Sequence, residues 1–89
     1  MITIEQEDGD VWLVTVDAAT KTQHRVTVSA ENLERFGRGK MDARELLEAS
    51  FRFLLEREPN TSILSAFDLP VIARYFPEYE RQIGRHLTS

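Results

Sequence analysis

The chain of 89 residues contains no cysteine, and it has only two histidines, three prolines and four glycines. The lack of cysteine excludes a disulfide, a thiolate nucleophile and any cysteine-based metal site. No apolar run approaches the roughly 20 residues that a membrane-spanning helix requires. The acidic start, MITIEQEDGD, does not have the composition of a signal peptide. These absences favour a cytoplasmic protein without membrane contact, and the length predicts a single domain over residues 1–89.

The net charge of −4 is distributed unevenly along the chain. Residues 1–20 contain acidic side chains but no lysine or arginine, whereas residues 21–40 are rich in basic ones. An acidic chain disfavours nucleic acid as a partner, although a local basic patch is compatible with one. The basic residues of this second stretch are Lys21, Arg25, Arg35, Arg38 and Lys40.

The first 28 residues have the alternating, β-branched pattern of strands. An Asp-Gly pair after the first strand is a strong hairpin signal, and the next connection is also short, which favours antiparallel pairing. We therefore expect a three-stranded meander over residues 1–28. Its strands are expected at 2–5, 11–17 and 24–28.

The second strand has apolar residues on both of its faces. Trp12, Val14 and Val16 share one face, and Val11 and Leu13 share the other. A three-stranded sheet needs only one buried face, so one of these sets lacks an obvious cover. Either the C-terminal segment wraps around it or a second copy of the chain covers it. Because pairing of two identical chains is the commonest way to cover such a face, the uncovered apolar set predicts a homodimer at micromolar concentration.

Residues 29–89 carry helix signals, of which the strongest begin the central helix. Asp42 and Glu45 have the spacing of a capping box, and Pro59 ends the helix near residue 58. The apolar arc of this helix is about twice the roughly 100° stripe of an ordinary surface helix, so we expect a sheet on one flank and another helix on the other. Ser50 lies inside the arc, and we expect its hydroxyl to bond the Leu46 carbonyl.

Shorter helices are expected on both sides of the central one. Ser29 has the position of an N-cap, and Asp68 has the same position before a later helix that contains Pro70 in its first turn. With the meander, these elements predict an α+β fold, in which the three strands are followed by and packed against three to four α-helices. The shorter helices are expected at 30–36, 63–67, 69–76 and 78–87.

The stretch from Ser50 to Glu80, SFRFLLEREPNTSILSAFDLPVIARYFPEYE, resembles a small family of uncharacterised bacterial proteins. The block that these proteins share contains LLEREP, SIL, FDL and YFPEY in that order, after a short β-rich N-terminus. The resemblance is close over this stretch and loose over the rest of the chain. It implies a bacterial cytosolic setting, and it implies no activity, cofactor or catalytic residue.

Candidate chemistry is sparse. The acidic residues between 5 and 10 fall across a hairpin turn and lack the ligand ladder of a calcium loop. His24 and His86 are far apart and have no H-x-x-x-H partner, so a packed strand residue and a helix-end residue are the simpler interpretations. Ser50 has no flanking glycines of a nucleophile elbow. We therefore predict no catalytic residue, no metal site and no cofactor.

Two sets of residues are candidates for binding. Gly-Arg-Gly-Lys after the first helix lacks the spacing of a P-loop, but its basic side chains could attract an anion. Aromatic residues that are partly exposed could instead anchor a partner protein. The candidate anion-binding residues are Arg35, Arg38 and Lys40. The candidate partner-binding residues are Trp12, Tyr75 and Tyr79.

These patterns favour a non-catalytic protein–protein interaction or assembly module, bound to another protein or to itself. The first alternative is a nucleic-acid-binding or antitoxin-like regulator that uses the basic stretch 21–40. A small enzyme is the least favoured alternative, because no pair of titratable residues has a spacing that a mechanism requires. Five basic groups on one exposed face would favour the regulator, a deep pocket near a histidine the enzyme, and an exposed apolar patch the interaction module.

Overall fold

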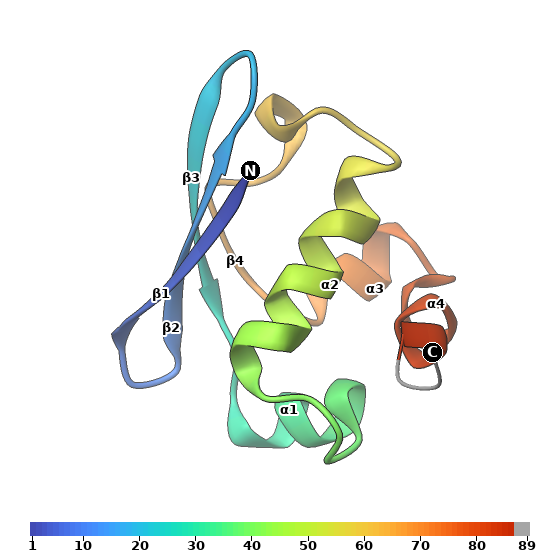
Figure 1. Cartoon of the computed structure of the whole chain (residues 1–89). Helices are drawn as coiled ribbons and strands as arrows, with labels where there is room; N and C mark the ends of the chain where they lie inside the picture. The colour runs from blue at the N-terminus through green and yellow to red at the C-terminus, as the bar shows by residue number, and fades with distance from the viewer. Residues whose placement is uncertain (87–89) are drawn as a thin grey trace.

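The structure is a computed structural model, and it describes residues 1–86. It is an α+β fold in which a mixed four-stranded sheet packs against four helices (Figure 1). The predicted class is therefore confirmed, and the part after residue 28 contributes a strand that the sequence pattern did not predict. The elements in chain order are β1 (Ile2–Asp8), β2 (Val11–Asp17), β3 (Lys21–Thr27), α1 (Ala30–Gly37), α2 (Ala43–Leu55), the 3-10 turn η1 (Asn60–Ser62), β4 (Ala66–Asp68), α3 (Val71–Tyr75) and α4 (Tyr79–His86).

The sheet has the order β1-β2-β3-β4. The first three strands form the predicted antiparallel meander, although β1 and β3 are longer than expected. The fourth strand runs parallel to β3 and pairs Phe67 with Val26. The helix expected at 63–67 is therefore wrong, because main-chain bonding to the open edge of β3 outweighs the local helix preference.

The connection from β4 to the next helix also differs from the prediction. Asp68 is the last residue of β4 and does not cap a helix. The next helix, α3, starts at Val71 with Pro70 at the N-cap position, and no side-chain hydrogen bond caps it. The last helix, α4, runs to His86, and the expected contribution of Leu87 lies outside the described residues.

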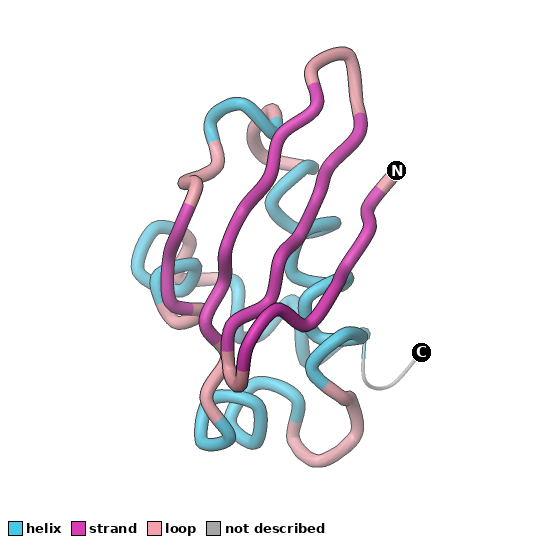
Figure 2. Tube along the Cα trace, turned by 90° about the vertical axis from the view of Figure 1, so that its left-hand side faces the viewer, coloured by secondary structure: helices cyan, strands magenta, loops and turns pink. Residues whose placement is uncertain are grey.

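All helices lie on one face of the sheet, and the other face is open (Figure 2). Val14 and Val16 are buried beneath the helices, so the Trp12 face of β2 is the inner one. Val11 and Leu13 on the open face are half-buried within the sheet surface. Neither the C-terminal segment in residues 1–86 nor any other element covers this face.

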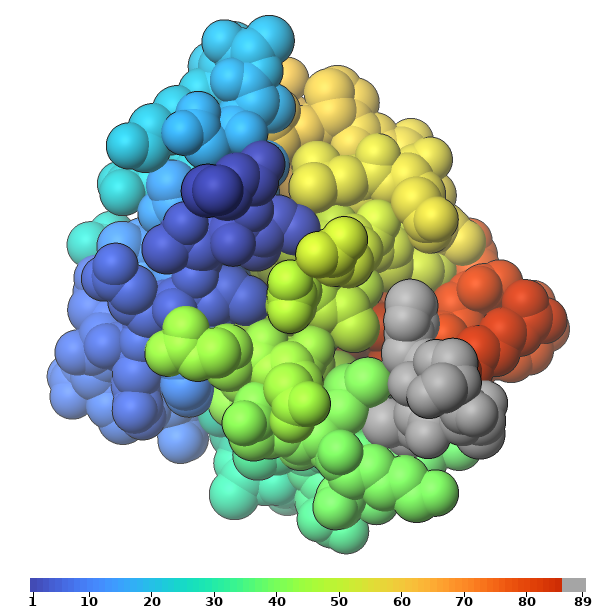
Figure 3. Space-filling model, in the orientation of Figure 1, coloured from blue at the N-terminus to red at the C-terminus, as the bar shows by residue number. Residues whose placement is uncertain are grey.

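Helix α2 forms the centre of the molecule and has the predicted capping box, with Asp42 accepting from the Glu45 amide at 2.8 Å. It ends at Leu55, earlier than expected, and its wide apolar arc is buried. The cover comes from β1 on one flank and from α1 and α4 on the other, as predicted. Figure 3 shows α2, in green to yellow, crossing the front between the N-terminal strands and the C-terminal helix.

Helix α1 has the predicted N-cap, because the Ser29 hydroxyl accepts from the Asn32 amide at 3.1 Å. Its end is a left-handed turn, in which Arg38 has a φ of 54° and Gly39 has a φ of 70°. Glycine adopts this conformation without steric cost, which explains Gly39, whereas Arg38 occupies it as the C-cap residue. The turn directs the chain into Asp42 and the start of α2.

Candidate functional site

An apolar groove lies between the end of α2, strand β4 and helix α3. Its volume is about 330 Å³. We call it the β4 groove, and it forms where the chain turns from η1 into β4 and then folds back as α3. Its lining residues are Leu54, Glu58, Ser62, Ile63, Leu64, Phe67, Val71, Ile72, Tyr75 and Phe76.

Two of the most exposed apolar side chains belong to this groove. In residues 1–86 the large hydrophobic residues that remain exposed are Met1, Leu64 and Tyr75. Leu64 is 47% exposed and precedes β4, and Tyr75 is 67% exposed at the end of α3. Single exposed apolar residues are ordinary, but two on the same groove form a patch that favours an interaction site. Tyr75 is the candidate partner-binding residue that lies on this patch.

The floor of the groove is part of the hydrophobic core. Phe67 packs against Phe51 with the ring centroids 6.3 Å apart, and Phe51 is fully buried under the sheet. Ile63 and Ile72 are also buried, so the groove is a shallow extension of a rigid interior. Such a floor keeps its shape without a ligand, which lowers the entropic cost of binding.

A closed polar network holds the loop before β4. His24 Nδ1 lies 2.7 Å from the Leu64 carbonyl, which can only accept, so this nitrogen carries the proton. His24 Nε2 lies 2.9 Å from the Thr22 hydroxyl, which donates to it when the ring is neutral. The Asn60 amide donates to the Thr22 hydroxyl oxygen at 2.9 Å and to the Thr20 carbonyl at 2.7 Å.

His24 is 1% exposed and does not line the groove. Both of its ring nitrogens are engaged, which matches the interpretation of a packed strand residue. Its role is to fix the main chain at Leu64, and through it the start of β4. Glu58 is the one charged residue among those that line the groove. The arrangement therefore offers apolar surface and a single carboxylate, and no acid–base pair.

Tyr79 is not a partner-binding residue in this structure, because its side chain is completely buried. Its ring packs edge-on against Phe53 at 5.3 Å. Its hydroxyl lies 2.6 Å from Ser50 Oγ, which itself donates to the Leu46 carbonyl at 2.6 Å as predicted. Burial raises the pKa of the Tyr79 hydroxyl well above its ordinary value. The spacing of the aromatic residues in the sequence does not distinguish Tyr79 from Tyr75, whereas their burial in the structure does.

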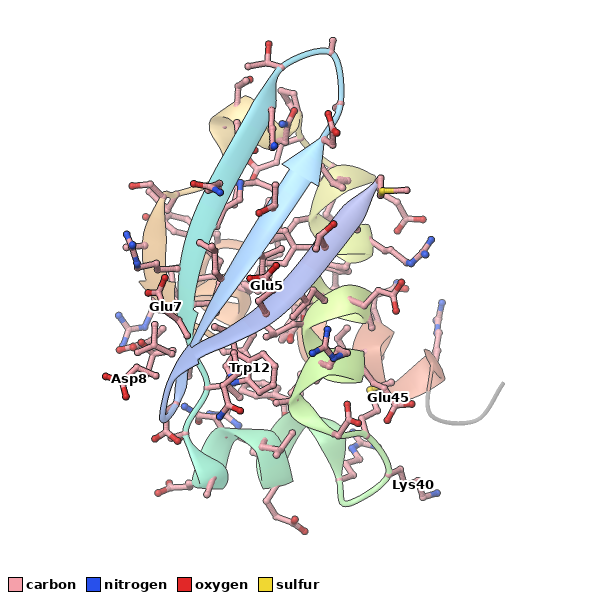
Figure 4. All side chains as sticks on the ribbon, turned by 60° about the vertical axis from the view of Figure 1, so that its left-hand side comes forward. Glu5, Glu7, Asp8, Trp12, Lys40 and Glu45 are labelled. Atoms are coloured by element: carbon pink, nitrogen blue, oxygen red, sulfur yellow. The ribbon has the colours of Figure 1, made fainter. Side chains whose placement is uncertain are left out.

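Trp12 lies away from the groove. It is half-buried on the inner face of β2 and packs against the core. The Arg44 guanidinium lies over its ring, 5.9 Å from the centroid. Figure 4 shows Trp12 on the helix side of the sheet, whereas Glu5, Glu7 and Asp8 lie along the hairpin. The three candidate partner-binding residues therefore do not share one surface.

The candidate anion-binding residues lie near α4. Arg35 donates to Glu80 at 3.1 Å, and its guanidinium also lies over the Phe36 ring. The Arg38 guanidinium lies close to the α4 backbone, about 3.4 Å from the position of a β-carbon at Gly84. Lys40 is exposed in the turn before α2 (Figure 4). The first two side chains therefore contact α4, and all three residues are exposed.

The remaining basic residues of the 21–40 stretch lie on another surface. Lys21 and Arg25 belong to β3, and their side chains lie on the open face of the sheet. Arg25 donates to Glu7 at 2.7 Å, and this bond raises the pKa of the guanidinium. The five basic groups therefore do not form one basic face.

Metal-binding and membrane-spanning features are absent from the described residues. Within residues 1–86, no three His, Cys, Asp or Glu side chains come together in a way that could hold a metal ion. In the same part of the chain, every helix is too short or too polar to cross a bilayer. No family model, curated protein or solved structure matches this chain. The case for function therefore depends on the geometry of the groove.

Proposed function

We propose that the chain is a non-catalytic protein-interaction module that binds a partner protein through the β4 groove. The observation that carries this proposal is the exposure of Leu64 and Tyr75 on one apolar groove with a rigid floor. Exposed apolar surface in a small domain costs solubility unless a partner covers it. The proposed setting is the bacterial cytoplasm, which the lack of cysteine and the family resemblance favour.

The chemistry of the groove supports binding over catalysis. Glu58 is its single charged group, and general acid–base catalysis ordinarily needs a second titratable group within hydrogen-bond reach. His24 lies behind the groove wall with both nitrogens engaged. These features favour a surface that recognises shape and apolar area.

The distribution of basic residues supports a protein partner over a nucleic acid. Arg25 and Arg35 are in ion pairs with Glu7 and Glu80, on different surfaces of the molecule. A nucleic-acid site would need cations arranged along one phosphate backbone, with most of them free to release counterions. The overall charge of −4 also opposes such binding.

The experiment is a comparative affinity capture from the native host. The bait proteins are the natural chain, the double variant Leu64→Ser with Tyr75→Ser, and the control Leu13→Thr on the open sheet face. We expect one protein partner to bind the natural chain and the control at equal levels and to be lost with the double variant. Circular dichroism checks that each bait is folded.

Equal capture by the double variant would contradict the proposal. Nucleic acid that co-purifies and is lost with Lys21→Ala or Lys40→Ala would favour the regulator instead. Either result would mean that the β4 groove does not bind the partner, because its exposed apolar side chains would not be needed for capture.

A further inference from the structure

Strand β4 forms one edge of the sheet, and its hydrogen bonds show which residues face β3. The Arg25 amide donates to the Ser65 carbonyl at 2.8 Å, and the Leu69 amide donates to the Thr27 carbonyl at 3.0 Å. In a parallel pair, alternate residues direct their main-chain groups to the same side. Ser65, Phe67 and Leu69 therefore face β3.

The intervening residues, Ala66 and Asp68, turn their main-chain N–H and C=O groups away from β3. Both residues are exposed, so these groups lie on the open edge of the sheet. An unpaired strand edge is a template for another strand, because an extended backbone presents matching donors and acceptors. The edge of β4 therefore has the hydrogen-bonding pattern that a partner in extended conformation would complete.

The β4 groove lies beneath this edge. Phe67 is paired with Val26 on the inner face, and its ring is part of the groove floor. Val71 and Tyr75 of α3 also line the groove. Side chains alternate between faces along a strand, so every second side chain of a strand added to β4 would point into the groove. Its volume is at the small end of the roughly 300–1,000 Å³ range of small-molecule pockets, which suits one or two aliphatic side chains.

The charges around the groove select basic side chains. Glu58 lines the groove, and Asp68 lies on the exposed edge. Within residues 1–86, neither carboxylate takes part in an ion pair. A segment with lysine or arginine between its aliphatic residues would compensate Asp68 directly, because these basic side chains point to the face opposite the groove, and it would offset Glu58 at longer range.

The extent of the groove favours a short segment over a second folded copy. A stable interface between folded domains buries about 800 Å² and 20–30 residues on each side. The groove is lined by ten residues, and Met1, the other exposed large hydrophobic residue among residues 1–86, does not line it. An added strand gains affinity from main-chain bonds and a few anchors, so it needs less area.

We propose that the β4 groove binds an extended segment of its partner by strand addition. The segment alternates aliphatic and basic residues: its main chain pairs with Ala66 and Asp68, and its aliphatic side chains enter the groove between Phe67 and Tyr75. This inference rests on the proposed function and adds the conformation and the chemical class of the partner segment.

The test uses a terminally blocked hexapeptide that alternates leucine and lysine, with a fluorescent label for anisotropy measurements. On the ¹⁵N-labelled chain, we expect the largest amide shifts at residues 64–68 and 71–76. Leu64→Lys and Tyr75→Ala should each weaken the affinity by about tenfold or more, because each removes an exposed apolar side chain that lines the groove. Arg52→Ala, on the exposed face of α2, is the matched control and should change the affinity less than about twofold.

Two N-methylated peptides test the backbone pairing. One is methylated at the leucine amides and the other at the lysine amides, and only one of these sets can face β4. We expect one methylated peptide to bind about tenfold more weakly and the other to bind like the parent. Asp68→Asn should weaken binding about threefold at low salt and Glu58→Gln should weaken it less, whereas Glu56→Gln should not change it.

Each outcome has a defined meaning. If both methylated peptides bind like the parent while Leu64→Lys still weakens binding, strand addition is wrong and the proposed function stands. If the shifts lie outside the groove and Tyr75→Ala has no effect, both proposals fail. Groove shifts that depend on protein concentration without peptide would show that a second copy occupies the groove, which overturns the partner segment.

Discussion

The two edges of the sheet are built differently. Strand β1 has seven residues, and the Arg44 guanidinium donates to the outward-facing carbonyl of Ile4. Strand β4 has three residues, and its outward-facing groups lie above an apolar groove. An edge can be protected by covering its acceptors with a charged side chain, and β1 shows this protection while β4 does not.

The side chains around the two edges of the sheet also differ. A second, more open recess lies beside the start of β1, and its charged rim residues, Arg52 and Glu56, are ion-paired with Glu48 and Arg57. A partner at that edge would have to displace Arg44 and reorganise these pairs. At β4 the rim carboxylates form no such pairs within residues 1–86. At β4 the main-chain groups and the side-chain surface are both left open, which is why the proposed partner segment is assigned to this edge.

The largest expected effect comes from removing the support that β3 and β4 share. Phe51 is fully buried and contacts His24 at 5.4 Å and Phe67 at 6.3 Å between ring centroids. Phe51→Ala should lower the free energy of unfolding by about 3–5 kcal/mol, because it leaves a cavity beneath both strands. Urea unfolding measures this loss. A loss of less than about 1 kcal/mol in unfolding free energy would mean that the floor of the β4 groove is not part of the core.

The two tyrosines, Tyr79 in the core and Tyr75 on the groove, are expected to contribute differently to the pH dependence of stability. Because the pKa of Tyr79 is raised in the folded state, its contribution to stability is complete below the unfolded pKa near 10 and is lost as the pH rises above it. The free energy of unfolding should then fall by up to about 1.4 kcal/mol per pH unit. Tyr79→Phe should remove this slope, measured by denaturant unfolding between pH 9 and 11.

Tyr75→Phe is the matched control for this experiment, since its ring is exposed on the groove. It should keep the alkaline slope of the natural chain. If Tyr79→Phe kept the slope and Tyr75→Phe removed it, the assignment of one tyrosine to the core and the other to the binding surface would be reversed.

A smaller loss of stability is expected when the Arg44 side chain that covers the edge of β1 is replaced. Arg44→Met keeps the length of the side chain but removes the bond to the Ile4 carbonyl and the contact with Trp12. We expect a loss of about 1 kcal/mol in unfolding free energy and stronger self-association through the freed edge. The predicted homodimer stays a prediction, and light scattering over a dilution series tests it for both proteins. If Arg44→Met has the same mass as the natural chain at every concentration, Arg44 does not guard the edge.

The smallest effect on stability is expected at the groove itself. Leu64→Ser and Tyr75→Ser should each change the free energy of unfolding by less than about 1 kcal/mol, because Tyr75 is mostly exposed and Leu64 is about half exposed. Thermal unfolding detects larger changes readily. A loss comparable with that of Phe51→Ala would show that these residues hold the fold together and are not kept for a partner.

Local signals predicted much of this fold. The capping box of Asp42 and Glu45, the N-cap at Ser29 and the antiparallel meander each depend on residues close together in the sequence. The position of Ser50 in the apolar arc also predicted its bond to the Leu46 carbonyl. These features could be predicted because the residue periodicity and the spacing of cap residues follow directly from helix and strand geometry.

Strand β4 and its groove could not be predicted in the same way. Phe67 pairs with Val26 across about forty residues, and no periodicity in a three-residue strand signals a distant partner. The groove depends on that pairing, because only then do Leu64 and Val71 flank Phe67. Of the candidate residues, Tyr75 was predicted from its position beside a proline, and the same signal gave Tyr79, which is buried.

Native-state amide hydrogen exchange of the free chain tests the open edge most directly. We expect the Phe67 and Leu69 amides, which face β3, to exchange about tenfold or more slowly than the amides of Ala66 and Asp68. Equal protection of all four amides would mean that another part of the molecule covers the edge. No protection at Phe67 would mean that β4 does not pair with β3, and either result would contradict the account.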